Sequence, residues 1–146
     1  MNISVKSVLL VTIQLGAILA IFATGPLFAS SPALLFLELL GGGVGLWALV
    51  AMRLTTFSVL PDVKRAGELT RRGPYRWIRH PMYLAVLLVT GALVLDQPTS
   101  LRMGIEVVLL IDILVKIGYE EALLLRHYPA YAAYRQATKR LLPYVY

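Results

Sequence analysis

The chain has 146 residues, of which 58% are hydrophobic and only 15% are charged, and its mean hydropathy is +0.73. This composition excludes an ordinary water-soluble domain and predicts a protein of the lipid bilayer. The net charge of +6 at pH 7 indicates cytoplasmic loops and anionic lipid head groups rather than nucleic acid. The absence of cysteine excludes disulfides and thiolate metal sites, and two separated histidines do not predict a metal site.

Four apolar segments approach the length of about 20 residues that a helix needs to cross a bilayer. In chain order they cover about residues 8–28, 33–52, 81–95 and 103–117. The first ends at the breaker Gly25-Pro26, and its length, with only Lys6 before it, favours a retained helix over a cleaved signal peptide. We therefore predict an all-α integral membrane protein with about four transmembrane helices.

The distribution of basic residues predicts the orientation. Seven basic residues lie between the second and third segments, at positions 53, 64, 65, 71, 72, 76 and 79, and four follow the fourth segment, at positions 126, 135, 139 and 140. Both regions should face the cytoplasm, as should both termini of a multi-pass protein of the cytoplasmic membrane. With no repeat or long linker, residues 1–146 form one predicted domain, with two transmembrane helices in residues 1–52 and the functional core in residues 53–146.

Ionisable residues inside apolar segments are costly and need a reason to be there. Glu38 shares a helix with Gly41 and Gly45, a small-residue spacing that favours close helix packing, so we interpret it as a packing contact. Asp112 and Lys116 are four residues apart and predict a neutralising pair on one helix face, of either structural or functional use.

Glu120 continues this face by one further turn, and Glu121 follows it. The stripe of acid, base and acid therefore runs from the middle of the fourth segment toward the cytoplasmic interface. Since it does not cross the membrane, it is not typical of a channel or transporter.

The loop before the third segment is rich in arginine, aromatic residues and turn signals: Arg71-Arg72-Gly73-Pro74-Tyr75-Arg76-Trp77-Ile78-Arg79-His80-Pro81-Met82-Tyr83. Gly73-Pro74 predicts a turn, and Pro81 suits the first turn of a helix. The free N–H groups of that turn, beside Arg79 and His80, can bind a carboxylate or phosphate. The alternative is a membrane anchor whose arginines contact head groups and whose aromatic residues lie in the interface.

This loop and the later Glu120-Glu121-x-x-Leu124 block, followed by Tyr131, Tyr134, Arg140 and Pro143, resemble the isoprenylcysteine carboxyl methyltransferase family. The related membrane phospholipid N-methyltransferases share the signature. The resemblance covers about residues 56–146. It implies binding of S-adenosylmethionine in a cytoplasmic pocket that the C-terminal segment closes, with no metal.

The resemblance also implies roles for individual residues. Positions matching the family's cofactor contacts are Gly67, Glu68, Leu69, Thr70, Tyr75, Arg79, His80, Pro81, Met82, Tyr83, Glu120 and Glu121. Of these, Glu120 should hold the amino group of the cofactor. Lys116 stands where eukaryotic members have a substrate-facing arginine, so Lys116 and Asp112 are the predicted substrate contacts. The predicted catalytic residues are Lys116, Glu120 and Arg140.

The chemistry of the cofactor agrees with these assignments, because its carboxylate, ammonium, sulfonium and adenine need a cationic or helix N-terminal site, a carboxylate and an aromatic wall. The expected acceptor is a lipophilic or lipid-linked small molecule that, like prenylcysteine, is methylated on its carboxylate. Membrane lipids are the other expected partners. N-methylation of a phospholipid amine is an alternative, with Asp112 or Glu121 as base. A non-enzymatic lipid-binding module is the other alternative.

Overall fold

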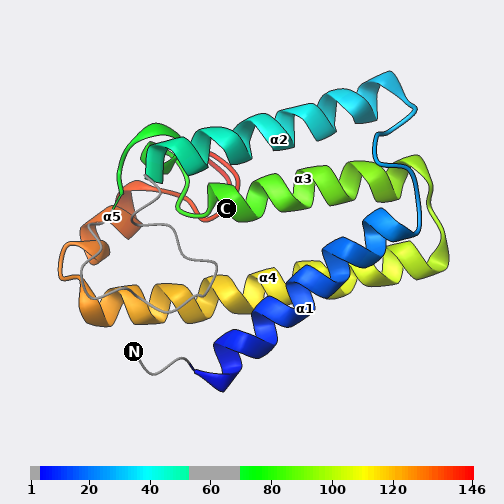
Figure 1. Ribbon diagram of the computed structural model, residues 1–146. Helices are drawn as coiled ribbons and strands as arrows, with labels where there is room; N and C mark the ends of the chain where they lie inside the picture. The colour runs from blue at the N-terminus through cyan, green and yellow to red at the C-terminus, as the bar shows by residue number, and fades with distance from the viewer. Residues whose placement is uncertain (1–3, 53–69) are drawn as a thin grey trace.

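The computed structural model describes residues 4–52 and 70–146 (Figure 1). In this part of the chain it is all-helical, in the order α1 Val5–Ala23, α2 Pro32–Met52, the 3₁₀ helix η1 Gly73–Arg76, α3 Pro81–Asp96, α4 Ser100–His127 and α5 Tyr131–Ala137. The all-α prediction is therefore confirmed for the described residues. Of these helices, α1 and α2 are long and apolar enough to cross a membrane.

The helix boundaries follow local signals. α1 begins after Ser4, whose hydroxyl accepts a hydrogen bond from the N–H of Lys6, and it ends at Ala23, earlier than the predicted residue 28, because Gly25-Pro26 cannot continue it. α4 extends beyond the apolar segment that ends at residue 117 and stops at His127, before Tyr128-Pro129. A residue before proline disfavours helical geometry, so the helix ends there.

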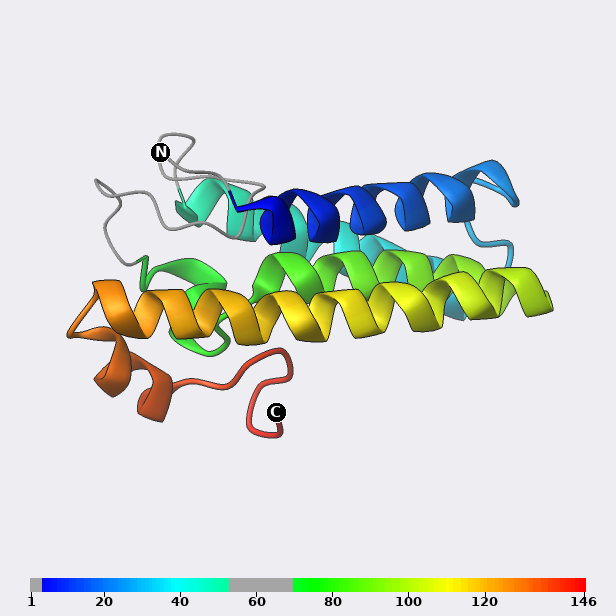
Figure 2. The same ribbon diagram turned by 90° about the horizontal axis from the view of Figure 1, so that it is seen from below.

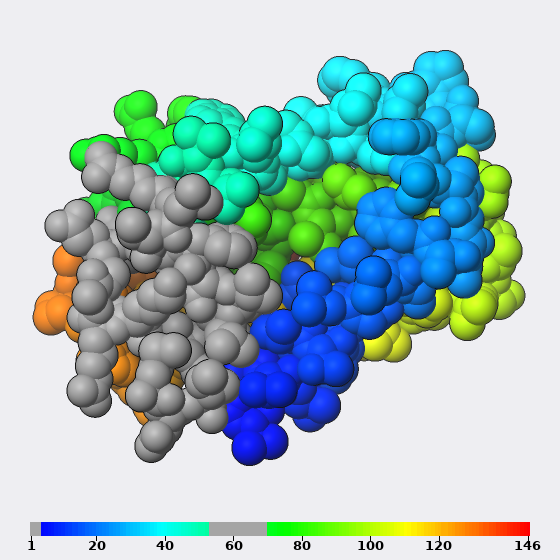
Figure 3. All heavy atoms as spheres, viewed as in Figure 1, coloured from blue at the N-terminus to red at the C-terminus, as the bar shows by residue number. Residues whose placement is uncertain are grey.

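The four long helices run in alternate directions, and the end of α2, the start of α3 and the end of α4 lie together with α5 at one end of the bundle, here called the α5 end (Figure 1). α2 packs along α3, whereas α1 crosses α4 and touches α3 (Figures 1 and 2). Figure 3 shows atoms of α3 between the diverging α1 and α2. The buried apolar core lies where α1, α3 and α4 meet, around Ile21, Leu93 and Ile113.

Close packing of α2 on α3 depends on small residues of α2. A Cβ at Gly41 would lie 2.8 Å from the Cβ of Leu88 and 3.0 Å from the carbonyl oxygen of Ala85. A Cβ at Gly45 would lie 3.1 Å from the Cβ of Ala85. These distances confirm the close approach that the glycine spacing predicts.

Two carboxylates hold the link between α1 and α2 at the end of the bundle opposite α5. Glu38 is buried, and its Oε2 accepts a hydrogen bond from the N–H of Ala29 at 2.9 Å, so its role here is structural. Asp96, at the end of α3, accepts hydrogen bonds from the N–H groups of Ser30 and Ser31, both at 3.0 Å. Because these N–H groups precede α2, the contact places a negative charge at the positive end of that helix.

Outward-facing apolar side chains cover the long helices. Strongly exposed examples include Phe36 and Val50 of α2, Leu19 of α1, and Val107 and Ile111 of α4. A water-soluble protein rarely exposes so many large apolar side chains, which a bilayer would cover.

Candidate active site at the start of the third helix

The loop before α3 is shaped by a glycine and fastened to the C-terminal segment. Gly73 has φ +56°, which an L side chain rarely adopts, and a Cβ there would lie 2.8 Å from the Cβ of Ala51. Farther along, the N–H of Arg79 donates to the carbonyl of Lys139 at 2.8 Å, and the N–H of His80 donates to the carbonyl of Arg140 at 3.0 Å. The C-terminal segment thus lies beside the entry to α3.

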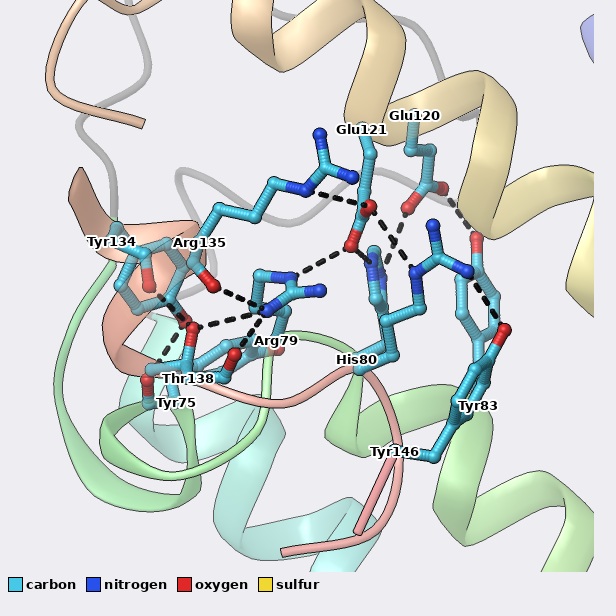
Figure 4. Close-up of polar contacts among 11 residues, drawn as sticks. Tyr75, Arg79, His80, Tyr83, Glu120, Glu121, Tyr134, Arg135, Thr138 and Tyr146 are labelled. Atoms are coloured by element: carbon cyan, nitrogen blue, oxygen red, sulfur yellow. Dashed lines mark hydrogen bonds and ion pairs between the residues drawn. The ribbon is translucent and has the colours of Figure 1, made fainter. Parts of the chain in front are cut away.

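Glu121 of α4 gathers charged residues from three parts of the chain (Figure 4). Its carboxylate lies 2.7 Å from Nε of Arg79, 3.4 Å from Nε of Arg140 and 3.8 Å from Nε of Arg135. The side chain is 4% exposed. We call Glu121, Arg79, Arg135 and Arg140 the Glu121 cluster. It joins the last turns of α4 to the loop before α3, to α5 and to the C-terminal segment.

The surroundings of Glu121 determine its acidity. Burial alone would raise the pKa of the carboxyl group, but hydrogen bonds from His80 and Arg79 and the positive charges of both lower this pKa to about 2. A carboxylate with so low a pKa is a weak proton acceptor. Glu121 is therefore unsuited to act as a general base and suited to hold neighbouring cations.

Arg79 also ties α5 to the site. Its NH1 donates hydrogen bonds to the carbonyl of Thr138 and, at 3.1 Å, to the carbonyl of Arg135. Together with the bond to Glu121, these contacts occupy much of the guanidinium inside the protein. The role of Arg79 as a direct cofactor contact stays a prediction.

Glu120 differs from Glu121 in its exposure and partners. Its Oε1 accepts a hydrogen bond from the hydroxyl of Tyr83, and its Oε2 lies 3.5 Å from Nδ1 of His80. The side chain is 20% exposed, so a ligand can reach the carboxylate, and no arginine pairs with it among the described residues. Glu120 therefore has capacity to accept further hydrogen bonds from a ligand cation.

His80 lies between the two glutamates at the N-cap of α3. Its ring is 6% exposed, stacks on Tyr83 at 5.7 Å between centroids, and has Nε2 at 3.4 Å from Glu121. Burial alone would lower the pKa of His80, but hydrogen bonding to Glu120 and Glu121 and their negative charges raise it above 6.5. No side chain caps the first turn of α3 in the described part of the chain, so its N–H groups stay available near His80.

Three tyrosines form an aromatic group next to the Glu121 cluster. The hydroxyl of Tyr134 donates to the carbonyl of Tyr75 at 2.7 Å, and the rings of Tyr131 and Tyr134 are 5.8 Å apart. Burial raises the pKa of Tyr134 to about 12 and raises the pKa values of Tyr75 and Tyr131 as well, so all three are neutral. The hydroxyls of Tyr75 and Tyr131 are buried without a hydrogen-bond partner among the described residues. The burial of Tyr75 argues against a purely interfacial role.

The predicted neutralising pair of Asp112 and Lys116 forms no ion pair. Both side chains are buried, on one face of α4 as predicted. However, Nζ of Lys116 donates to Oε1 of Gln14 in α1 and lies 5.2 Å from the ring centroid of Tyr83. Both carboxylate oxygens of Asp112 lack a hydrogen-bond partner in the described part of the chain.

The other predicted site residues are distributed as follows. Gly67, Glu68 and Leu69 lie outside the described residues, and Thr70 is the first residue after that gap. Pro81 is buried at the start of α3, and Met82 is half-buried beside it. Arg140, besides its contact with Glu121, donates to the hydroxyl of Tyr146 at 2.7 Å.

Sequence reasoning missed three residues of this region: Gln14, Arg135 and Thr138. Gln14 is an amide in the middle of an apolar helix, which is a signal of a polar contact that could have been used. Arg135 follows the Tyr131–Tyr134 pair by one position, but nothing in the sequence indicates that it faces Glu121. Thr138 contacts Arg79 mainly through its backbone carbonyl, which carries no side-chain signal.

These features define a membrane protein with an ionised, partly buried site at one end of its helix bundle. A family model described as phospholipid methyltransferase (PEMT) matches residues 33–131, well over half of the chain. The chain therefore belongs to the phospholipid methyltransferase family of membrane methyltransferases, which confirms the resemblance noted from the sequence. Members of this family generally use S-adenosylmethionine. The comparisons with curated proteins and with solved structures gave no match.

Proposed function

We propose that this protein transfers a methyl group from S-adenosylmethionine to the carboxylate of a lipophilic, prenylcysteine-like acceptor. The observation that carries the proposal is the partly exposed carboxylate of Glu120, held by Tyr83 and His80 at the N-terminus of α3, in a chain of the methyltransferase family. The proposal assigns cofactor binding to the α5 end of the bundle, under the C-terminal segment.

The residues at this end suit the groups of the cofactor. Glu120 can accept hydrogen bonds from its ammonium, and the first turn of α3 beside His80 can receive its carboxylate. Tyr75 and Tyr131 offer neutral rings for the adenosyl part, together with buried hydroxyls that have no hydrogen-bond partner among the described residues. The cofactor supplies an activated methyl group, so the protein has to align the reactants and exclude water.

Lys116 and Arg140 complete the proposed catalytic set. Lys116 lies one helical turn before Glu120, where its ammonium can orient an acceptor carboxylate that enters from the lipid side. A carboxylate is ionised at neutral pH, so no base is needed for its methylation. Arg140 contacts Glu121 and, through its backbone, His80, and so holds the C-terminal segment over the site.

N-methylation of a phospholipid amine is the second candidate, and one observation favours it. An ammonium acceptor must lose a proton before it attacks. The buried carboxylate of Asp112, which accepts no hydrogen bond from the described residues, is available to bind the amine or take the proton. Glu121 is a poor candidate for this task because of its low pKa.

We also propose that all four long helices cross the membrane, with the α5 end and both termini in the cytoplasm. α3 and α4, with 16 and 28 residues, span about 24 and 42 Å, against a bilayer core of about 30 Å. Short α3 would then need local thinning of the bilayer. Reporter fusions after Leu27 and Thr99 should give non-cytoplasmic signals, and a cytoplasmic signal at either position would refute this topology.

The test of the enzymatic proposal uses the full chain in detergent or nanodiscs. Calorimetry measures binding of S-adenosylmethionine, and transfer of a labelled methyl group is measured with N-acetyl-S-farnesylcysteine and with vesicles of phosphatidylethanolamine. Methylation of the first probe supports the carboxylate acceptor, and methylation of the second supports the amine acceptor instead. A folded protein that binds no S-adenosylmethionine would support a non-enzymatic lipid-binding module.

A further inference from the structure

Lys116 is held by a residue from outside the region that matches the family. Its side chain is 1% exposed, so its ammonium has to find partners inside the protein. The partners are Oε1 of Gln14 and the ring face of Tyr83. Gln14 belongs to α1, which precedes the matched residues 33–131.

Both partners give the ammonium a favourable contact inside the protein without cancelling its positive charge. The amide of Gln14 accepts a hydrogen bond but carries no charge, and the ring of Tyr83 attracts the cation through its quadrupole. Asp112 on the same helix face is buried and accepts no hydrogen bond from any described residue, Lys116 included. Asp112 and Glu120 act on the ammonium through space, without forming an ion pair with it. Because no carboxylate is in direct contact with it, the ammonium can still form an ion pair with a negatively charged ligand.

The position of Lys116 connects this charge to the proposed reaction site. The phenol of Tyr83 donates to Glu120 while its ring contacts the Lys116 ammonium. Tyr83 thus lies between the Lys116 ammonium and Glu120, the proposed partner of the cofactor ammonium. An anion bound to Lys116 would therefore lie close to Glu120 and to a cofactor bound there.

We propose that Gln14 is a positioning residue that orients the Lys116 ammonium for the acceptor carboxylate while leaving it without a direct ion-pair partner. The inference rests on the proposed function and deepens it, because it makes α1 part of the acceptor site. The neutrality of the amide is the property that matters. A residue of the same shape with a negative charge should compete with the acceptor for Lys116.

The decisive variant is Gln14→Glu, which keeps the shape and the contact but neutralises the cation. We expect a folded protein with unchanged affinity for S-adenosylmethionine and an unchanged or higher Tm. Its kcat/KM for N-acetyl-S-farnesylcysteine should fall about tenfold or more, mainly through a higher KM for this probe, since a charge-assisted contact is lost. Gln14→Leu should show a smaller loss, because the ammonium keeps its charge but loses its orientation.

Thr12→Val is the matched control on the same helix. Thr12 is exposed, and among the described residues its hydroxyl donates only to the carbonyl of Val8 in its own helix, at 2.9 Å. This variant should keep wild-type kinetics.

The outcomes separate the two levels of the proposal. Wild-type protein that binds no S-adenosylmethionine would refute the proposed function. Wild-type turnover of the farnesylcysteine probe that Gln14→Glu leaves unchanged would refute only the role of Gln14, and would show that the contact merely supports packing. Cofactor binding without turnover of this probe would refute the acceptor class and, with it, the inference.

Discussion

Replacing Glu120 by glutamine tests the centre of the proposed cofactor site. The substitution keeps the shape of the side chain and leaves an oxygen that can accept the hydrogen bond from Tyr83. It removes the negative charge that faces His80 at 3.5 Å and that would face the cofactor ammonium. Because the side chain is 20% exposed, the fold should tolerate the loss of charge.

The expected loss of affinity follows from the type of contact. A hydrogen bond to a charged group is typically worth about 1.5–3 kcal/mol, so the dissociation constant for S-adenosylmethionine should rise about ten- to a hundredfold. Loss of the carboxylate also removes one of the two negative charges beside His80. With less negative charge beside it, His80 is protonated less readily, and this indirect effect offsets part of the loss, because a neutral imidazole repels the ammonium less than a charged one.

The assay is calorimetry with S-adenosylmethionine on the purified full chain, together with a thermal melt of each variant. Glu106→Gln is the matched control: it is the same change on the same helix, and Glu106 contacts Thr90 at 3.2 Å instead of the site. The control should bind with wild-type affinity. If a well-folded Glu120→Gln variant also kept wild-type affinity, Glu120 would not be the partner of the ammonium.

Three further predictions concern stability. Glu121→Gln should lower the unfolding free energy by about 3–5 kcal/mol, because it removes the charge of a carboxylate that is only 4% exposed and leaves the surrounding cations without it. The readout is a lower Tm, and an unchanged Tm would mean that the Glu121 cluster contributes little to stability. Since the pKa of His80 is raised, its stabilising contribution is present below pH 6.5 and is lost as the pH rises through its folded-state value. The wild-type Tm should therefore fall as the pH rises above 6.5, and His80→Gln should flatten that dependence; equal slopes would contradict a charged His80. Gly41→Ala should destabilise the protein by about 1–3 kcal/mol through contact with α3, whereas Gly42→Ala, with nothing within 4 Å, should not lower the Tm.

The four long helices of this protein could be predicted from the sequence because their signals are local, whereas α5 was not predicted. Apolar segments of membrane length, the Gly25-Pro26 breaker and Pro81 at a helix start depend only on neighbouring residues. The resemblance assigned the loop motif and the Glu120-Glu121 pair to one predicted cofactor site, but it did not predict the contacts between them. The structure brings His80 and Tyr83 to Glu120, and Arg79 to Glu121.

The sequence could not predict that the two glutamates have different surroundings. Glu120 and Glu121 are chemically identical neighbours, but successive residues of a helix point about 100° apart. Only the packing of α4 turns Glu121 toward the arginines of the loop and the C-terminal segment, and leaves Glu120 partly exposed beside Tyr83.

By itself, the sequence determined the all-helical membrane class, the family and the residues that gather at the start of α3, since composition, spacing and motif are properties of the chain. The tertiary structure decided the partner of Lys116. A spacing of four residues on one helix predicted Asp112, because it puts both side chains on one face. In the structure, Lys116 instead donates a hydrogen bond to Gln14, 102 positions away. This contact forms because α1 crosses α4 at this level and places a neutral acceptor beside the buried cation. Sequence spacing reports neighbours on one helix, whereas the crossing of two helices is set by how their whole surfaces pack.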